Sequence, residues 1–249
     1  MLRVVLSFRS KIHHPDLEIS PYLVQQFMHI KTLHIFSSNL EEQVAFYSNV
    51  LGLDMIQRND HQVSLKIGKP TLCIEYKPKA TPYHFAINIP SNKEDEALKW
   101  LESRVTILRD GENEIQDFDY WNAKAIYFYD KDQNIVEFIA RKNLDNTTNS
   151  VFNVNQMLEI SEIGLPTVDV EREFKILNQF TDIEIFDGGF ERFCAIGDEH
   201  GLFICVNKNV KKWFPTDDEA YSSDFKIELI EKGNTYQFIF ENEKLNHFH

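Results

Sequence analysis

LHIFSSNLEEQVAFYSNVLGL, the stretch from Leu33 to Leu53, contains a complete strand-to-helix transition and decides the fold. An apolar segment leads into Asn39, a typical helix cap, and Glu42 stands three positions later, as in a capping box. Apolar residues then recur at the spacing of one helical face, at Leu40, Val44, Tyr47 and Leu51. The stretch therefore predicts a β-strand followed by an amphipathic helix.

The segments on both sides of this stretch complete a βαβββ unit. The leading strand is predicted over Ile30–Ser37. After the helix, strand-like segments follow at Met55–Arg58, Gln62–Ile67 and Thr71–Tyr76. A unit this small cannot bury a core alone, so it must pair with another unit.

A second copy of the pattern opens with a strand over Tyr83–Ile89 and has Ser91 and Glu94 as a second capping box. Its strands are predicted near Val105–Arg109, Ala125–Tyr129 and Ile135–Ala140. We expect these two modules, residues 28–80 and 81–145, to form one domain. Residues 1–27 are expected to be an N-terminal extension outside it.

The C-terminal part carries two weaker copies. The third starts at Met157, with Asp169 as its helix cap and a hairpin over Phe193–Ile196 and Leu202–Val206. The fourth retains strands at Phe225–Ile230 and Tyr236–Phe240 but no convincing helix. Residues 146–249 are therefore expected to form a second, degenerate domain.

Composition limits the classes of function. The net charge of −13 argues against a nucleic-acid or anionic-membrane partner, which a basic face would bind. No apolar run approaches the ~18 residues of a membrane span, and the start lacks a secretory signal. The three cysteines are sparse and form no CxxC pair, as is typical of buried thiols in a reducing compartment, so a cytoplasmic location is expected.

Several segments resemble one known superfamily. Leu33–Leu53 closely resembles the opening of vicinal oxygen chelate proteins, which include glyoxalases, bleomycin- and fosfomycin-resistance proteins and extradiol dioxygenases. YHFAINIP (Tyr83–Pro90) and IYFYDKDQNIVEFIAR (Ile126–Arg141) resemble its second module. GDEHGLFICV (Gly197–Val206) and WFPT (Trp213–Thr216) are similar to the C-terminal half of two-domain, glyoxalase-like members. The resemblance implies an α+β fold whose paired βαβββ modules form half-open sheet cups around a divalent metal.

The resemblance also implies metal ligands. His84 occupies the first-strand position where the family places an imidazole, and Glu137 the last-strand position of its carboxylate. These donors suit Fe, Zn, Mn or Ni, with the identity of the ion undetermined. The alternatives are a hydrogen-bonded core histidine and a carboxylate at a solvent-facing edge.

The first module departs from the family pattern. Thr32 stands where a second ligand is expected and is a poor donor for such metals. His34 lies two residues later, on the same strand face, and is our candidate third ligand, with a role in lining the cavity as the equal alternative. Glu75 is the fallback ligand. In the third unit Glu162 takes the position of Thr32, but no histidine or carboxylate completes a set in the fourth, so we expect no metal site in the C-terminal half.

Tyr127 and Glu137 are the candidate catalytic residues. Tyr127 stands where extradiol dioxygenases have a substrate-binding tyrosine, but the acid–base histidine usually found before it is absent. The sequence therefore favours, by a small margin, glyoxalase-like isomerase or lyase chemistry on a small substrate over ring cleavage. The alternative is a metal-free binding protein of the bleomycin-resistance type.

The protein is expected to be a monomer or homodimer. The other histidines are expected at the surface: His13, His14, His29, His61, His200, His247 and His249.

Overall fold

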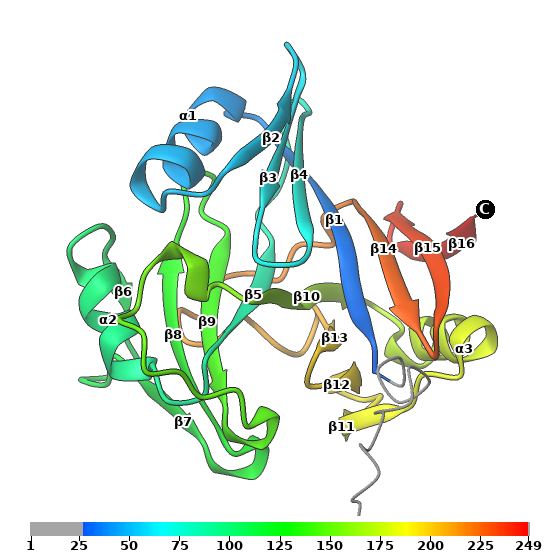
Figure 1. Ribbon diagram of the computed structural model, residues 1–249. Coiled ribbons are helices and arrows are strands. Elements are labelled where there is room, and N and C mark those ends of the chain that lie inside the picture. Colours follow the sequence, from blue (N-terminus) through cyan, green and yellow to red (C-terminus); the bar gives the residue numbers. More distant parts are fainter. Residues whose placement is uncertain (1–26, 249) are drawn as a thin grey trace, which may run out of the picture.

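The computed structural model describes residues 27–248 (Figure 1). The expected N-terminal extension, residues 1–27, therefore lies outside the described residues except for Phe27. The α-helices are α1 (Leu40–Ala45), α2 (Glu94–Glu102) and α3 (Val170–Thr181), and α1 continues into a π-helical turn over Phe46–Val50. None of the helices within 27–248 has the length and apolar character needed to cross a bilayer.

Two mixed sheets carry the fold. The first has the strand order β16-β15-β14-β1-β4-β3-β2. Its strands are β1 (His29–Ser37), β2 (Met55–Arg58), β3 (Gln62–Lys66), β4 (Thr71–Tyr76), β14 (Phe225–Glu231), β15 (Asn234–Glu241) and β16 (Lys244–Phe248).

The second sheet has the order β11-β12-β13-β10-β5-β9-β8-β6, with β7 paired to β8. Its N-terminal strands are β5 (His84–Ile89), β6 (Ile107–Leu108), β7 (Gln116–Phe118), β8 (Ala123–Tyr129) and β9 (Ile135–Arg141). Its C-terminal strands are β10 (Glu159–Thr167), β11 (Ile185–Gly189), β12 (Phe193–Asp198) and β13 (Gly201–Asn207). The predicted α+β class with half-open sheets is confirmed.

The pairing of the modules differs from the expected one. The orange and red strands β14 and β15 lie beside the blue strand β1 in Figure 1, so the first module shares its sheet with the last one. Strand β5 pairs antiparallel with β10, which joins the second module to the third. Modules 28–80 and 81–145, which were expected to form one domain, therefore lie in different sheets. Each module offers the same kind of unpaired backbone edge along its first strand, so its sequence does not select which edge it meets.

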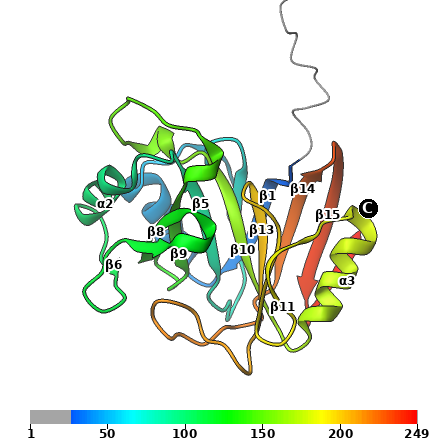
Figure 2. The same ribbon diagram turned by 90° about the horizontal axis from the view of Figure 1, so that it is seen from below.

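The helices cover the outer sides of the sheets, with α2 and α3 at opposite ends of the molecule (Figure 2). Asp169 caps α3 as predicted, because its side chain accepts a hydrogen bond from the backbone N–H of Arg172 at 3.0 Å. The other two predicted capping boxes are wrong. Asn39 precedes α1 but donates its side-chain hydrogen bond to Asp132, and α2 starts after Lys93 rather than after Ser91.

Candidate metal centre

Three neighbouring strands of the second sheet, β10, β5 and β9, bring together one histidine and two carboxylates. His84 is the first residue of β5. Ala86, two residues later, is in register with Glu137 of β9 on one side and with Glu162 of β10 on the other. Residues two apart on a strand, and residues in register across strands, lie on the same face. All three side chains therefore point into one concave face of the sheet.

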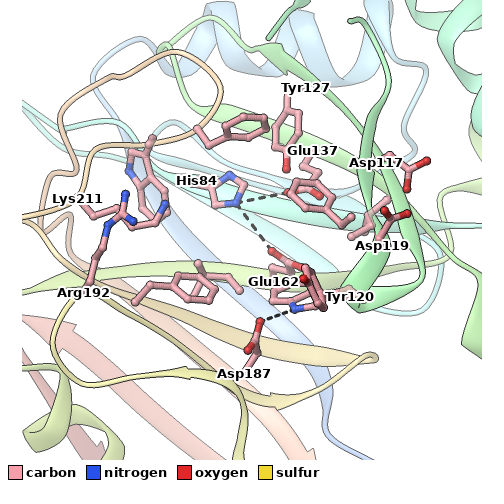
Figure 3. A pocket seen from close by; sticks show the side chains of 17 residues that line it. His84, Asp117, Asp119, Tyr120, Tyr127, Glu137, Glu162, Asp187, Arg192 and Lys211 are labelled. Atoms are coloured by element: carbon pink, nitrogen blue, oxygen red, sulfur yellow. Dashed lines mark hydrogen bonds and ion pairs between the residues drawn. The ribbon is translucent and has the colours of Figure 1, made fainter.

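Figure 3 shows the three side chains converging. His84 Nε2 lies 3.5 Å from Oε2 of Glu137 and 3.8 Å from Oε2 of Glu162. Each of the three side chains is buried. The structure thus brings together His84 and Glu137, as the sequence predicted, and adds Glu162.

The protonation of His84 follows from its surroundings. Its Nδ1 lies 3.1 Å from the backbone oxygen of Ile135, a distance at which the ring N–H donates to the carbonyl. Burial lowers the pKa of His84 to about 4, and the charge of Lys211 acts in the same direction. The ring is therefore neutral at pH 7, with its proton on Nδ1 and the Nε2 lone pair facing the two carboxylates.

The carboxylates outnumber the cations beside them. Glu162 forms an ion pair with the fully buried Arg141. Burial raises the pKa of Glu137, the charge of Glu162 raises it further, and Arg141 and a hydrogen bond with Tyr127 oppose the rise. Burial likewise raises the pKa of Glu162, against the attraction of Arg141. One guanidinium thus faces two buried carboxyl groups, and the electrostatic balance of the cluster requires a proton or a further cation.

A divalent metal ion fits this set of residues. An unprotonated imidazole nitrogen and two carboxylate oxygens are donors for Fe, Zn, Mn and Ni. The Ile135 carbonyl supplies the second interaction that usually orients a ligating histidine, and Arg141 does the same for Glu162. The bare Nε2 lone pair opposite carboxylate oxygens is repulsive unless positive charge lies between them.

The position in the third module that is equivalent to Glu137 carries no metal-binding side chain. Glu137 is in register with Ala86, two residues after His84, and Ile204 of β13 is in register with Gly164, two residues after Glu162. Ile204 therefore corresponds to Glu137 in the third module. Three protein ligands on one side leave the other side of an ion free for substrate oxygens or water.

A cavity of about 540 Å³ opens over the cluster. Its walls are mostly aromatic and come from the loop after β7 and from the segment around β12 and the chain after β13: Phe118, Tyr120, Trp121, Phe193, Trp213 and Phe214. Arg192 and Lys211 line one side, and neither forms an ion pair with an acidic side chain among residues 27–248. Asp187, on another side, accepts a 2.7 Å hydrogen bond from the indole N–H of Trp121.

Two aromatic residues lie beside the imidazole. The ring of Trp213 is 4.9 Å from that of His84 between centroids, and the ring of Tyr127 is 6.3 Å away. Trp213 approaches this closely because Gly164 has no side chain, and a Cβ there would lie 2.8 Å from the indole. Burial and the charges of Glu137 and Glu162 raise the pKa of Tyr127, so its hydroxyl is protonated and able to donate a hydrogen bond.

The candidate ligand His34 is not part of this cluster. It belongs to β1 in the first sheet, where its Nε2 lies 2.8 Å from Oε2 of Glu75, the fallback ligand. The first sheet thus holds His34 together with Glu75 and Thr32. The prediction that His34 joins His84 and Glu137 is wrong. The reason is the module pairing, which sets β10 rather than β1 beside β5.

Glu162 takes the place that the sequence assigned to His34. The signal was present, because Glu162 lies seven residues before its helix cap, as His84 lies seven residues before Ser91. This spacing points to Glu162 as a site residue only when the third module is known to pair with the second. The C-terminal half, in which no separate metal site was expected, thus places Glu162 beside the candidate ligands of the N-terminal half.

Comparisons with known proteins support the fold. A catechol-2,3-dioxygenase of Bacillus subtilis is 30% identical over 129 residues, a match that covers 47% of this chain and 43% of that protein. The chain thus spans less than half the length of this curated relative. No protein-family model matches the sequence.

Two solved structures overlap with larger parts of the chain. A putative dioxygenase from Bacillus subtilis has a TM-score of 0.54 at 15% identity, covering 73% of this chain and 64% of that one. A glyoxalase I variant from Zea mays has a TM-score of 0.52 at 12% identity, covering 85% and 92%. The resemblance to the vicinal oxygen chelate proteins is confirmed at the level of the fold.

Proposed function

We propose that this protein is a metal-dependent enzyme in which His84, Glu137 and Glu162 bind a divalent ion at the base of the aromatic cavity. The observation that carries the proposal is the His84 Nε2 lone pair, which faces two buried carboxylates that share one arginine. Bound there, the ion would act as a Lewis acid on two adjacent oxygens of a small substrate.

The residues around the ion have separate roles. Arg141 neutralises Glu162 and holds it in place, so Glu137 is the carboxylate left to accept a proton from the substrate. Tyr127 keeps its proton and donates a hydrogen bond toward the substrate or toward Glu137. Trp213 excludes water from the face of the His84 ring.

The cavity walls indicate the class of substrate. The aromatic side chains accept a flat, apolar body, and the unpaired charges of Arg192 and Lys211 favour an anionic group at one side. A small organic anion with two vicinal oxygens, one or both of them carbonyl or phenolic, matches both features.

Proton-transfer chemistry, as in isomerases and lyases, is our first choice of reaction. Among the described residues that line the cavity, His84 is the only histidine, so a separate acid–base histidine for ring cleavage is lacking. Oxygen-dependent cleavage of a catechol is the second choice, and the partial likeness to a catechol-2,3-dioxygenase favours it.

The test is metal content followed by a substrate screen. Untagged protein is purified, its metals are measured by mass spectrometry, and the same is done for H84A and H34Q. We expect bound divalent metal in the parent and in H34Q, and about one equivalent less of it in H84A. The loaded protein is then assayed with hemithioacetals and, under air, with catechols. An H84A variant that holds as much metal as the parent would overturn the proposal.

Metal-free ligand binding is the competing function, and Ile204 is the observation that favours it. An apolar residue at the position equivalent to Glu137, and a proton shared between Glu137 and Glu162, would make the cluster a polar floor for a bound ligand. This function predicts that the parent protein is free of metal and turns over no substrate. The H84A variant should then differ from it only in ligand affinity.

A further inference from the structure

A second group of side chains of the types that can ligate a metal lies where the two sheets meet. His29 is the first residue of β1 in one sheet, and Glu159 is the first residue of β10 in the other. His200 lies in the turn between β12 and β13. One potential ligand atom from each of these three residues lies within 4.8 Å of the others. Both histidines were expected at the surface, but the fold makes them converge on a buried carboxylate.

The contacts within this group are close but incomplete. His200 Nδ1 is 2.8 Å from Oε1 of Glu159, and His29 Nδ1 is 3.4 Å from Oε2, which is longer than a good hydrogen bond. The two imidazole rings lie 4.8 Å apart and tilted by 55°. The histidine side chains are about one quarter exposed, while that of Glu159 is 9% exposed. An ion can therefore reach the group from solvent and still meet a buried anionic ligand.

The surrounding charge favours a cation. Asp198 accepts hydrogen bonds from the backbone N–H groups of Met28 and His200, which fixes it beside the group. Burial, with the charge of Asp198 second, raises the pKa of Glu231 to about 7, while Lys232 and His29 oppose the rise. Asp198 and Glu231 therefore repel each other beside the group, and a cation bound there would reduce that repulsion.

We propose that His29, Glu159 and His200 form a second divalent metal site, separate from the His84 centre, that takes Zn²⁺ or a similar transition-metal ion and links the two sheets. Two imidazoles and one carboxylate are a ligand set for Zn, Ni, Cu or Fe rather than for Mg or Ca. Binding replaces the hydrogen bond between His200 and Glu159, and any proton on the imidazoles leaves to solvent.

A chain of buried hydrogen bonds runs from this site to the first one. Asn88 donates to Oε1 of Glu159 at 3.0 Å and accepts from Nε of Arg141 at 3.2 Å. Arg141 in turn is paired with Glu162 of the His84 cluster. An ion that draws Glu159 toward the histidines therefore acts on Asn88, which in turn contacts the arginine that holds Glu162 of the first site.

The test is a zinc titration that counts ions. The parent is the untagged full chain with H13A/H14A, because these adjacent histidines lie outside the described residues. It is titrated with ZnCl₂ by calorimetry, next to H84Q, H29Q/H200Q and E159Q in the same background. The exposed His61 supplies the matched control, H61Q. Circular dichroism verifies that each variant is folded, and long-range ¹H–¹⁵N spectra follow the imidazole nitrogens.

We expect two ions in the parent and in H61Q, and one ion each in H84Q and H29Q/H200Q. E159Q should lose the same ion as H29Q/H200Q while keeping the neighbouring hydrogen bonds of residue 159. Zinc should shift the imidazole signals of His29 and His200 even in H84Q. A parent that binds only one ion, which H84Q retains and H29Q/H200Q loses, would support this site and reject the proposed function. An unchanged ion count in H29Q/H200Q and E159Q would overturn this site and leave the His84 centre untouched.

Discussion

The guanidinium of Arg141, at the end of β9, is fully buried and forms an ion pair with the carboxylate of Glu162 on β10. The pair crosses β5 and joins the second module to the third. It also leaves Glu137 without an arginine of its own, so one interaction stabilises the junction of two modules and sets the charge of the candidate metal centre.

Removing this arginine should destabilise the fold. In R141M the carboxylates of Glu162 and Glu137 are left buried without a counter-ion, which costs about 3–5 kcal/mol when a buried pair is broken. Urea unfolding at pH 7 in the presence of a chelator measures the loss. The control K175M breaks the exposed pair of Lys175 with Glu171 and should cost less than about 1 kcal/mol. Equal stabilities of R141M and K175M would contradict the assigned role.

A methyl group at Gly164 should displace Trp213 from His84. The added Cβ would stand 2.8 Å from the indole ring, so the ring must move or the strand must shift, at a cost of about 1–3 kcal/mol. The indole N–H signal of Trp213 and the urea midpoint of G164A report the change. G189A is the matched control, since no atom lies within 4 Å of a Cβ at that position. An unshifted Trp213 signal in G164A would argue against the packing described here.

Asp130 should make stability depend on pH. Its buried carboxylate accepts hydrogen bonds from Tyr47 and Asn134, both at 2.7 Å, yet burial raises its pKa to about 6 from 3.8. Between these values the folded chain holds a proton that the unfolded chain has released, so this contribution to stability grows as pH falls from 7 toward 4.

The comparison with D130N isolates this contribution. The unfolding free energy of the parent minus that of D130N should rise by about 2–3 kcal/mol between pH 7 and pH 4, measured by urea unfolding at both values. The surface variant D95N measures the effect of removing an exterior carboxylate. A difference that falls with decreasing pH would show that Asp130 is ionised in the folded chain.

The three thiols should be unreactive while the chain is folded. Cys194 and Cys205 face each other across β12 and β13, and Cys73 is buried in β4; all three are free. Burial raises the pKa of Cys194 to about 11 and raises that of Cys205 well above its usual range. Since the thiolate is the reactive form, Ellman's reagent should react far more slowly with native than with denatured protein. Rapid release of three equivalents without denaturant would contradict this burial.

The sequence alone determined the local units and two of the site residues. Helical spacing after Asn39 and alternation in the strands gave the βαβββ pattern, because amphipathic periodicity is a local property of the chain. His84 and Glu137 were identified from the resemblance to a known superfamily, in which each position has a fixed place within one module. The strands β7, β11 and β16 were missed, because their pairing depends on neighbours rather than on their own residues.

Only the tertiary structure decided which modules share a sheet. The edges of first strands present the same backbone groups in every module, so the choice of β10 over β1 as the neighbour of β5 depends on the packing of the whole chain. That choice replaced His34 by Glu162 beside His84 and placed Arg141 between them and Asn88. It also brought His29 and His200 to Glu159 from distant parts of the chain, a convergence that no local pattern records.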